Sequence, residues 1–155
     1  MDRLWSPWRY QYVSKADGGA ECIFCKADHF VVHRGVHNFV ILNIYPYTTG
    51  HLMVAPYAHV ATLVDAQLEA LAEMMQLTRL AERHLRDLYR PDGLNIGMNI
   101  GAAAGAGIAG HIHMHVLPRW SGDANFMTTV GETRVMPEAL EVTFQRLTEA
   151  WRAVF

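Results

Sequence analysis

Three histidines at alternate positions constrain the fold of this chain more than any other feature. His111, His113 and His115 alternate with apolar residues in the run GHIHMHVLPRW, which spans 110–120. Successive side chains of a β-strand point to opposite faces, so a strand here gathers the imidazoles on one face and the apolar side chains on the other. The sequence therefore predicts a strand over 112–118 that packs its apolar face on the interior and places a row of imidazoles along a cleft.

This histidine face has three interpretations. A solvated face that happens to carry histidine is the least favoured, because three imidazoles recur at a period of two. A metal site is the second, since the H-x-H spacing recurs in zinc enzymes, although the segment offers no obvious further ligand. The third is nucleophilic and acid–base catalysis by histidine itself, whose pKa near neutrality suits both roles.

The other periodic segments predict an α+β fold with an antiparallel sheet. Strands are expected over 39–43, 51–56 and 94–100, with a Pro- and Gly-containing connection between the first two. Apolar residues at helical spacing predict a long amphipathic helix over 65–89, and the tail over 137–155 predicts a second. The apolar positions of the long helix are Leu68, Leu71, Ala72, Met75, Leu80, Leu85 and Leu88.

No linker or internal repeat divides the sequence, so we expect one domain over 1–155, with an irregular N-terminal arm over 1–20. The net charge of −2 argues against a nucleic-acid partner held by bulk positive charge. No apolar run reaches membrane-spanning length, and the first residues lack the pattern of a secretory signal. We therefore expect a cytoplasmic protein with neither a membrane nor a nucleic-acid partner.

The two cysteines of the sequence, Cys22 and Cys25, have C-x-x-C spacing. In a reducing compartment this spacing indicates a metal site or a redox pair more than a structural disulfide. The alternative is a pair of reduced thiols in a small core, since free cysteine is often buried. Four further histidines are expected in loops or on solvated surfaces: His29, His33, His37 and, on the long helix, His84.

A glycine-rich run precedes the histidines, and from Gly105 to Gly110 it reads G-x-G-x-x-G. A dinucleotide-binding turn of this pattern follows a strand and opens a helix, whereas this run leads into the histidine strand. The favoured interpretation is that these glycines let the backbone approach a phosphate and donate N–H groups to it. A flexible connection without a ligand is the alternative.

The segment HIHMHVLP fits the pattern His-φ-His-φ-His-φ-φ, in which φ is apolar, and resembles the histidine-triad (HIT) superfamily of nucleotidyl hydrolases and transferases. The runs LWSPWR, MNIGAAAGAGIAGHIHMHVLPRW and SGDANFM are similar to its bacterial branch related to diadenosine tetraphosphate phosphorylases and Fhit-like nucleotide hydrolases. The resemblance covers residues 3–145. It implies the HIT fold, an antiparallel sheet of about five strands with one long helix and a C-terminal helix, and a homodimer.

The resemblance also implies the catalytic residues. His113, the middle histidine, would attack the α-phosphorus and form a covalent nucleotidyl-histidine. His115 and His51, the latter in the run GHLMVAP, would contact phosphate oxygens, and His111 would hold the local geometry. The sister branch of uridylyltransferases carries Gln at the third triad position, so His115 favours a hydrolase or phosphorylase. The resemblance implies no catalytic metal or organic cofactor at the triad.

The implied substrates are adenosine-containing phosphoanhydrides, for example dinucleoside polyphosphates such as diadenosine tetraphosphate. The implied substrate-binding residues are Asn43, Asn99, Gly105, Gly107 and His115, and Asp123, Asn125 and Phe126 are further candidates for the cleft wall. Ile100 and Ala102 are apolar where related sequences often carry polar or basic side chains, which leaves the grip on the distal phosphates open. Two alternatives remain: a nucleotide-binding or sensing module with little turnover, and an adenosine phosphoramidate hydrolase.

Several bacterial members of the family hold a structural zinc through a C-x-x-C pair, a histidine after the second hairpin strand and the first triad histidine. The matching positions are Cys22, Cys25, His59 and His111. Four protein ligands leave no open coordination position, so this ion would be structural and would clip the N-terminal arm to the histidine strand. The rival hypothesis is a zinc hydrolase that uses the triad itself as ligands.

Overall fold

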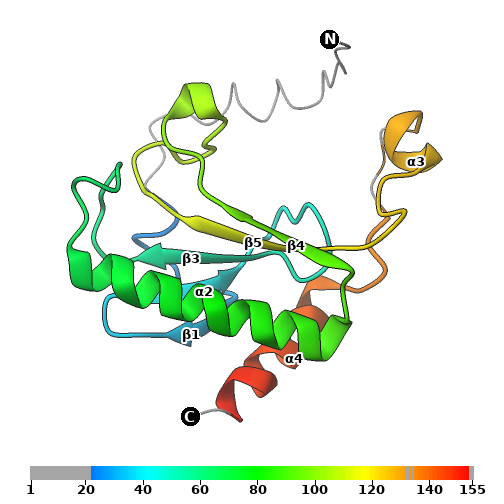
Figure 1. The fold of residues 1–155 in the computed structure, drawn as a ribbon, viewed down its shortest axis with the longest axis horizontal. Helices are drawn as coiled ribbons and strands as arrows, with labels where there is room; N and C mark the ends of the chain where they lie inside the picture. The colour runs from blue at the N-terminus through cyan, green and yellow to red at the C-terminus, as the bar shows by residue number, and fades with distance from the viewer. Residues whose placement is uncertain (1–21, 132, 134, 154–155) are drawn as a thin grey trace.

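The computed structural model describes residues 22–131, 133 and 135–153, so the arm expected over 1–20 lies outside the described residues. An antiparallel five-stranded sheet has the order β1-β2-β3-β5-β4. Its strands are β1 (Val31–Arg34), β2 (Asn38–Leu42), β3 (Leu52–Pro56), β4 (Gly93–Gly97) and β5 (Met114–Arg119). The helices are α2 (Leu68–Tyr89), α3 (Phe126–Thr129), α4 (Leu140–Arg152) and the short 3₁₀ helix η1 (Ala102–Ala104) (Figure 1). The predicted α+β fold is confirmed.

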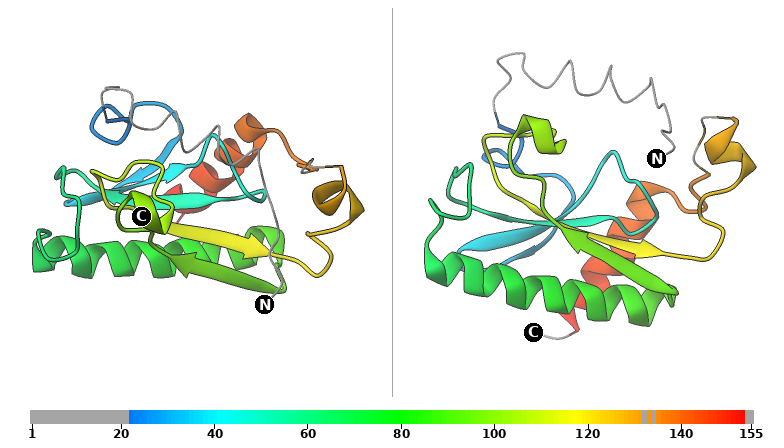
Figure 2. Two further views of the ribbon diagram at one scale, coloured as in Figure 1. Left: turned by 90° about the horizontal axis from the view of Figure 1, so that it is seen from above. Right: turned by 45° about the horizontal axis from the view of Figure 1, so that its top comes forward.

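Both longer helices pack on one face of the sheet. α2 contacts β2, β3 and β5, whereas α4 packs against β1 and α2. In Figure 1 α2 crosses in front of the lower strands, α4 lies towards the bottom and η1 lies above the sheet, and Figure 2 shows the same elements from two further directions. The opposite face is covered by loop segments around Phe24 and Ile108, so it is there that a ligand cavity can form.

Alternate residues of the central strands separate the two faces. On β3, Leu52 and Val54 are fully buried against the helices, whereas Met53 joins Phe24 and Phe39 in a second apolar cluster on the opposite face. Both faces of β2 and β3 are largely buried, and apolar residues accordingly fill β3 and the last four positions of β2. The sheet is therefore a wall between a helical core and a loop-covered face.

The buried face of α2 differs from the predicted one. The helix begins at Leu68 rather than at 65, and the side chains of Leu68 and Met75 are exposed. The residues buried on α2 are Ala70, Met74, Leu77, Thr78, Ala81, His84 and Leu85. Small side chains such as Ala70 and Ala81 let the helix lie close to the sheet, so counting large apolar residues misplaced the face. No helix in the described part of the chain is both long and apolar enough to cross a membrane.

The strand boundaries also shift. β4 ends at Gly97 rather than at 100, and β5 begins at Met114 rather than at 112. β1 is not among the strands located from the sequence, because it has four residues and its register with β2 is irregular between Val31 and His33. A short strand with a register shift lacks the clean alternation on which such a prediction depends.

The turn between β1 and β2 is fastened to α2 by one carboxylate. Glu73 accepts hydrogen bonds from the backbone N–H groups of Val36, His37 and Asn38 and from Asn38 Nδ2, all at 2.7–2.8 Å. Burial opposes ionisation of Glu73, but these hydrogen bonds outweigh it and lower the pKa of the carboxyl. The carboxylate therefore stabilises the fold fully above about pH 4.5, and the effect is lost as the pH falls through the lowered pKa.

We expect Glu73→Gln to reduce the free energy of unfolding by about 2 kcal/mol at neutral pH, because an amide oxygen is a weaker acceptor than a carboxylate and the amide brings N–H groups toward backbone donors. Urea unfolding measures this difference. The difference should shrink in acid, where the parent also carries a neutral side chain. A difference that is absent at neutral pH, or independent of pH, contradicts the role given to Glu73.

His84 is buried rather than solvated, which corrects the prediction from the helix pattern. Its side chain is 4% exposed, and its ring centre lies 4.6 Å from that of Trp151 on α4. Burial lowers the pKa of His84; the carboxylate of Asp87 opposes this effect, whereas Arg83 and His33 add to it. The folded chain therefore disfavours the imidazolium form at this position.

We expect the free energy of unfolding to fall as the pH drops below about 6.5, because the unfolded chain accepts a proton that buried His84 resists. His84→Leu, which cannot titrate, should lose less stability between about pH 7 and about pH 5. Urea unfolding at each pH measures the slope, and His29→Gln, at an exposed position, is the control. The same slope in His84→Leu and the parent would exclude this contribution.

Candidate active site

The triad histidines occupy the sheet face opposite the helices, as the alternating pattern predicts. Ile112 and Val116 lie in the helix-side core. His113 and His115 line a cavity of about 540 Å³, whereas His111 is fully buried and is not among its wall residues. The cavity walls also include Phe24, Ala27, Ile41, Asn43, Tyr45, Tyr47, Met53, Gly105, Gly107 and Ile108. Such a volume with mostly apolar walls is typical of small-molecule sites.

The hydrogen bond of His113 fixes which of its ring nitrogens carries the proton. His113 Nδ1 lies 2.9 Å from the carbonyl oxygen of His111, and a carbonyl can only accept, so Nδ1 donates. Burial lowers the pKa of His113, while the bond to the His111 carbonyl opposes this effect. The neutral ring therefore has an unprotonated Nε2, which is the form required of a nucleophile.

His51 and His115 form a hydrogen-bond relay that leaves the Nε2 of His115 protonated, unlike the Nε2 of His113. His51 Nδ1 lies 3.2 Å from the backbone N–H of Tyr47 and 3.3 Å from Asn43 Nδ2, and both of these groups donate to it. His51 Nε2 must then carry the proton that it donates to His115 Nδ1 at 2.9 Å. In neutral His115 the remaining proton lies on Nε2, so this ring is a hydrogen-bond donor.

The pKa of His115 supports the same protonation state. Burial and the neighbouring His113 lower it to about 4, so the ring is neutral at physiological pH. The ring centres of His113 and His115 lie 4.8 Å apart. Two adjacent neutral imidazoles thus offer a lone pair and an N–H group along one cavity wall.

The predicted substrate-binding residues are brought together only in part. Asn43, directly after β2, and the glycines Gly105 and Gly107 line the cavity. Asn99 does not line it; its Nδ2 lies 3.5 Å from the carbonyl oxygen of Gly105, so it contacts the glycine loop instead. Gly105 has φ of 88°, a left-handed conformation that favours glycine.

The candidates that follow the triad lie elsewhere. Asp123 and Asn125 line a separate cavity of about 480 Å³, next to the C-terminal ends of α2 and β5. Phe126 is 70% exposed and lines neither cavity. Asp123 pairs with Arg119 at 2.6 Å, which fixes the turn after β5. The expectation that these residues line the histidine cavity is therefore wrong.

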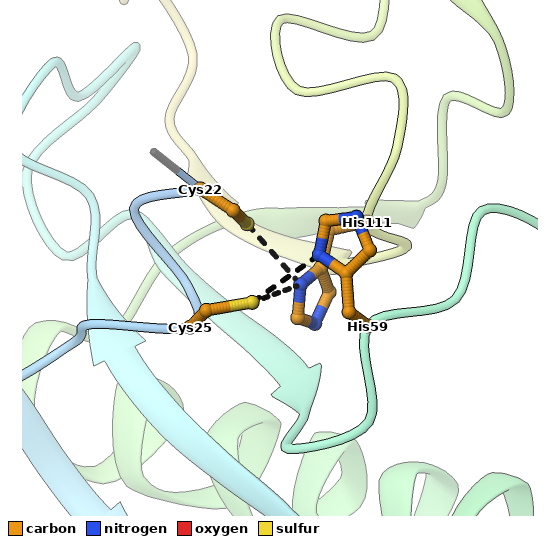
Figure 3. A group of neighbouring side chains, drawn as sticks. All are labelled: Cys22, Cys25, His59 and His111. Carbon is orange, nitrogen blue, oxygen red and sulfur yellow. Dashed lines mark hydrogen bonds between the residues drawn. The ribbon is translucent and has the colours of Figure 1, made fainter. Parts of the chain in front are cut away.

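Four side chains converge beside the histidine cavity in a cluster suited to a metal (Figure 3). The Sγ atom of Cys22 lies 3.3 Å from His111 Nδ1, and that of Cys25 lies 3.2 Å from His59 Nδ1 and 3.7 Å from His111 Nδ1. All four ligand atoms lie within 4.8 Å of one another. Cys22, Cys25, His59 and His111 are the four residues that the resemblance implies, so these residues could bind a metal.

The donor set and its spacing fit a zinc ion. Tetrahedral zinc with bonds of about 2.3 Å to sulfur and about 2.0 Å to nitrogen places neighbouring donors about 3.3–3.8 Å apart. His111 Nε2 lies 2.8 Å from the Pro56 carbonyl and donates to it, which leaves Nδ1 unprotonated for a metal. Among the described residues, His111 is the one triad histidine in the cluster, so the arrangement differs from a catalytic site built on the whole triad.

Two residues of the site, Tyr47 and Phe24, were not predicted from the sequence. Tyr47 contributes its backbone N–H to His51, an interaction that carries no side-chain signature. Phe24 lies within the C-x-x-C segment, and its ring centre is 5.2 Å from that of His111 and 4.8 Å from that of His113. The contact of Phe24 with these histidines could have been sought from the sequence, because an aromatic residue lies between the two cysteines.

Comparisons with known proteins agree with this geometry. The family model described as HIT domain matches residues 26–122. A protein of Mycobacterium tuberculosis named AP-4-A phosphorylase is 38% identical, over 97% of this chain and 85% of its own length. An uncharacterized HIT-like protein, Rv1262c of the same organism, is 35% identical over 66% of this chain and 74% of its own.

Solved structures share the fold. A zinc-bound histidine triad family protein from Mycobacterium smegmatis has a TM-score of 0.71 and 31% identity, covering 88% of this chain and 97% of that one. A hypothetical histidine triad nucleotide-binding protein, ST2152 from Sulfolobus tokodaii, has a TM-score of 0.70 and 27% identity, covering 86% and 93%. The chain therefore belongs to the HIT family, as an enzyme of the nucleotide hydrolase and nucleotidyltransferase class.

Proposed function

We propose that this enzyme cleaves adenosine-containing phosphoanhydrides, such as diadenosine tetraphosphate, through a covalent nucleotidyl-histidine on His113. One observation carries the proposal: hydrogen bonding leaves Nε2 unprotonated on His113 and protonated on His115, and these two residues line one cavity with ring centres 4.8 Å apart. Displacement at phosphorus needs a nucleophile and a donor for the phosphate oxygens. The name of the AP-4-A phosphorylase relative supports the substrate class.

In the first step, His113 Nε2 forms a bond to the α-phosphorus while the bond from phosphorus to the bridging oxygen breaks. The electron pair of that bond leaves with the rest of the substrate. The ring gains positive charge, and the hydrogen bond from Nδ1 to the His111 carbonyl stabilises it. In the second step, an oxygen of water or of inorganic phosphate forms a bond to the same phosphorus while the bond from phosphorus to Nε2 breaks. The electron pair of that bond returns to the ring, and an attacking water loses its proton to solvent. His115 and the glycine loop donate to the phosphate oxygens, and Asn43 contacts the ribose.

Incubation with diadenosine tetraphosphate, with and without inorganic phosphate, tests the proposal. ADP plus ATP formed only with phosphate indicates phosphorolysis, whereas AMP plus ATP indicates hydrolysis. Adenosine phosphoramidates in the same panel test the alternative leaving group. Tight AMP binding without any product across the panel would contradict the proposal and favour a sensing module.

Truncation of His115 is expected to reduce turnover by about 10²-fold, because one donor to a developing phosphate charge is lost. His115→Gln, which keeps an N–H donor, should lose less than His115→Ala. Steady-state rates of both variants measure the order. Equal losses would mean that the N–H group of His115 does not contribute.

The metal-ligand cluster enters the proposal as a structural zinc site. Cys22, Cys25, His59 and His111 would hold the ion, which supplies a rigid link between separate segments and takes no part in the reaction. The zinc-bound M. smegmatis relative supports this assignment. A homodimer, a cytoplasmic location and the absence of a nucleic-acid partner stay predictions from the sequence.

A further inference from the structure

Phe24 stands between the metal-ligand cluster and the nucleophile. We infer that it is a positioning residue through which a metal bound to the cluster holds the ring of His113, an inference that rests on the proposed function. Its ring centre lies 4.8 Å from that of His113 and 5.2 Å from that of His111. Phe24 is 4% exposed and also lines the histidine cavity, so one side chain contacts the ligand set, the nucleophile and the substrate space.

The backbone ties Phe24 to the cysteines on either side of it. The N–H of Cys25 donates to the carbonyl of Cys22 at 3.1 Å, which closes a tight turn with Phe24 inside it. A metal bonded to both thiolates would therefore fix the turn at two points, and the ring between them would follow. Phe39 supports the ring of Phe24 from the sheet, with ring centres 6.5 Å apart.

Two rings contact the imidazole of His113, those of Phe24 and His115, each with its ring centre 4.8 Å away. Its Nδ1 is held by the His111 carbonyl, a bond that allows the ring to pivot about it. The phenyl ring of Phe24 is tilted by 37° to the imidazole at a ring-centre distance of 4.8 Å, so it limits that pivot. Displacement of a reacting atom by about 1 Å is enough to lower a rate substantially. Loss of the metal would thus leave the orientation of the His113 ring, and so the position of Nε2, less restricted without removing any catalytic group.

The metal-ligand cluster is also connected to His113 through the backbone of His111, and the experiment must distinguish this connection from the one through Phe24. His111 is itself a candidate ligand, and its carbonyl accepts from His113 Nδ1. NMR of ¹³C-labelled histidine rings separates the two routes, because the ring current of Phe24 acts on the His113 ring protons at this distance. We expect the His113 ring signals to shift when a chelator removes zinc from the parent. In Phe24→Leu that holds about one zinc per chain, this response should be lost.

Ile23→Ala is the matched control, since Ile23 lies in the same turn and lines the same cavity but is exposed. It should keep the response to the chelator. An undiminished response in Phe24→Leu would assign the coupling to the His111 backbone and overturn the inference, as would a parent whose His113 signals ignore the chelator. This readout needs no turnover, so it is independent of the substrate proposal.

Kinetics of the zinc-loaded proteins give a second test that does not require the metal-free state to fold. Phe24→Leu is expected to lower kcat about tenfold with a much smaller change in KM, because the orientation of the His113 nucleophile is affected and substrate binding is not. Phe24→Tyr, which keeps the ring, should restore most of kcat. A raised KM with unchanged kcat would show that Phe24 only packs against the bound substrate, and would overturn the positioning role.

Discussion

Replacement of His113 by alanine is expected to lower the turnover of diadenosine tetraphosphate by about 10³-fold or more, because the group that forms the covalent intermediate is removed. The adduct itself is the sharper measurement. Acid-quenched parent enzyme should show the mass of one added nucleotidyl group by mass spectrometry, and the variant should show none. The zinc content and the cooperative unfolding of the variant should match those of the parent, since His113 does not belong to the metal-ligand cluster.

Two further variants keep this prediction decisive. His113→Gln fills more of the space left by the buried ring, so it separates loss of the nucleophile from loss of packing. His37→Gln is the control, because His37 lies in the turn between β1 and β2 and lines neither cavity. Turnover near the parent level in either His113 variant, or an adduct mapped to another histidine, contradicts the assigned nucleophile.

The alternation at the triad could be predicted from sequence because one face of the strand is buried. A shift of one residue would move Ile112 and Val116 out of the core, so the pattern admits one orientation for the histidines. The buried face of α2 was harder to predict from the sequence, because this helix has large apolar residues on more than one side. His84 follows Ala81 by three residues and Leu77 by seven, so its place on the buried face was readable once that face was known.

Which residues come together in the structure could be predicted only in part, and the positions of the ring protons could not be predicted. The C-x-x-C spacing indicated the two cysteines of the metal-ligand cluster, whereas the resemblance supplied His59 and His111, which lie far from that pair in sequence. Which nitrogen of His113 or His115 carries a proton depends on a backbone carbonyl and on the relay through His51. Backbone groups have no sequence signature, so the complementary lone pair and N–H donor emerge only from the folded chain.

Removal of both cysteine ligands, in a Cys22→Ser, Cys25→Ser double variant, is expected to abolish zinc binding and to lower the melting temperature by roughly 8–16 °C. A ligand at about 1,000 times its Kd stabilises a fold by about 4 kcal/mol, and each kcal/mol corresponds to about 2–4 °C in a domain of this size. The effect is large because the cluster joins the turn 22–25 to His59 and to His111, three residues before β5. Elemental analysis and calorimetry measure the two quantities.

Chelation distinguishes loss of the metal from damage caused by the substitutions themselves. Chelator-treated parent should melt close to the double variant, and the same treatment should leave the double variant unchanged. Turnover should fall in both, since the turn that carries Phe24 is no longer fixed beside His113. If instead the double variant keeps its zinc and His113→Ala loses it, the ion is bound by the triad. His113 would then be a metal ligand and could not be the nucleophile.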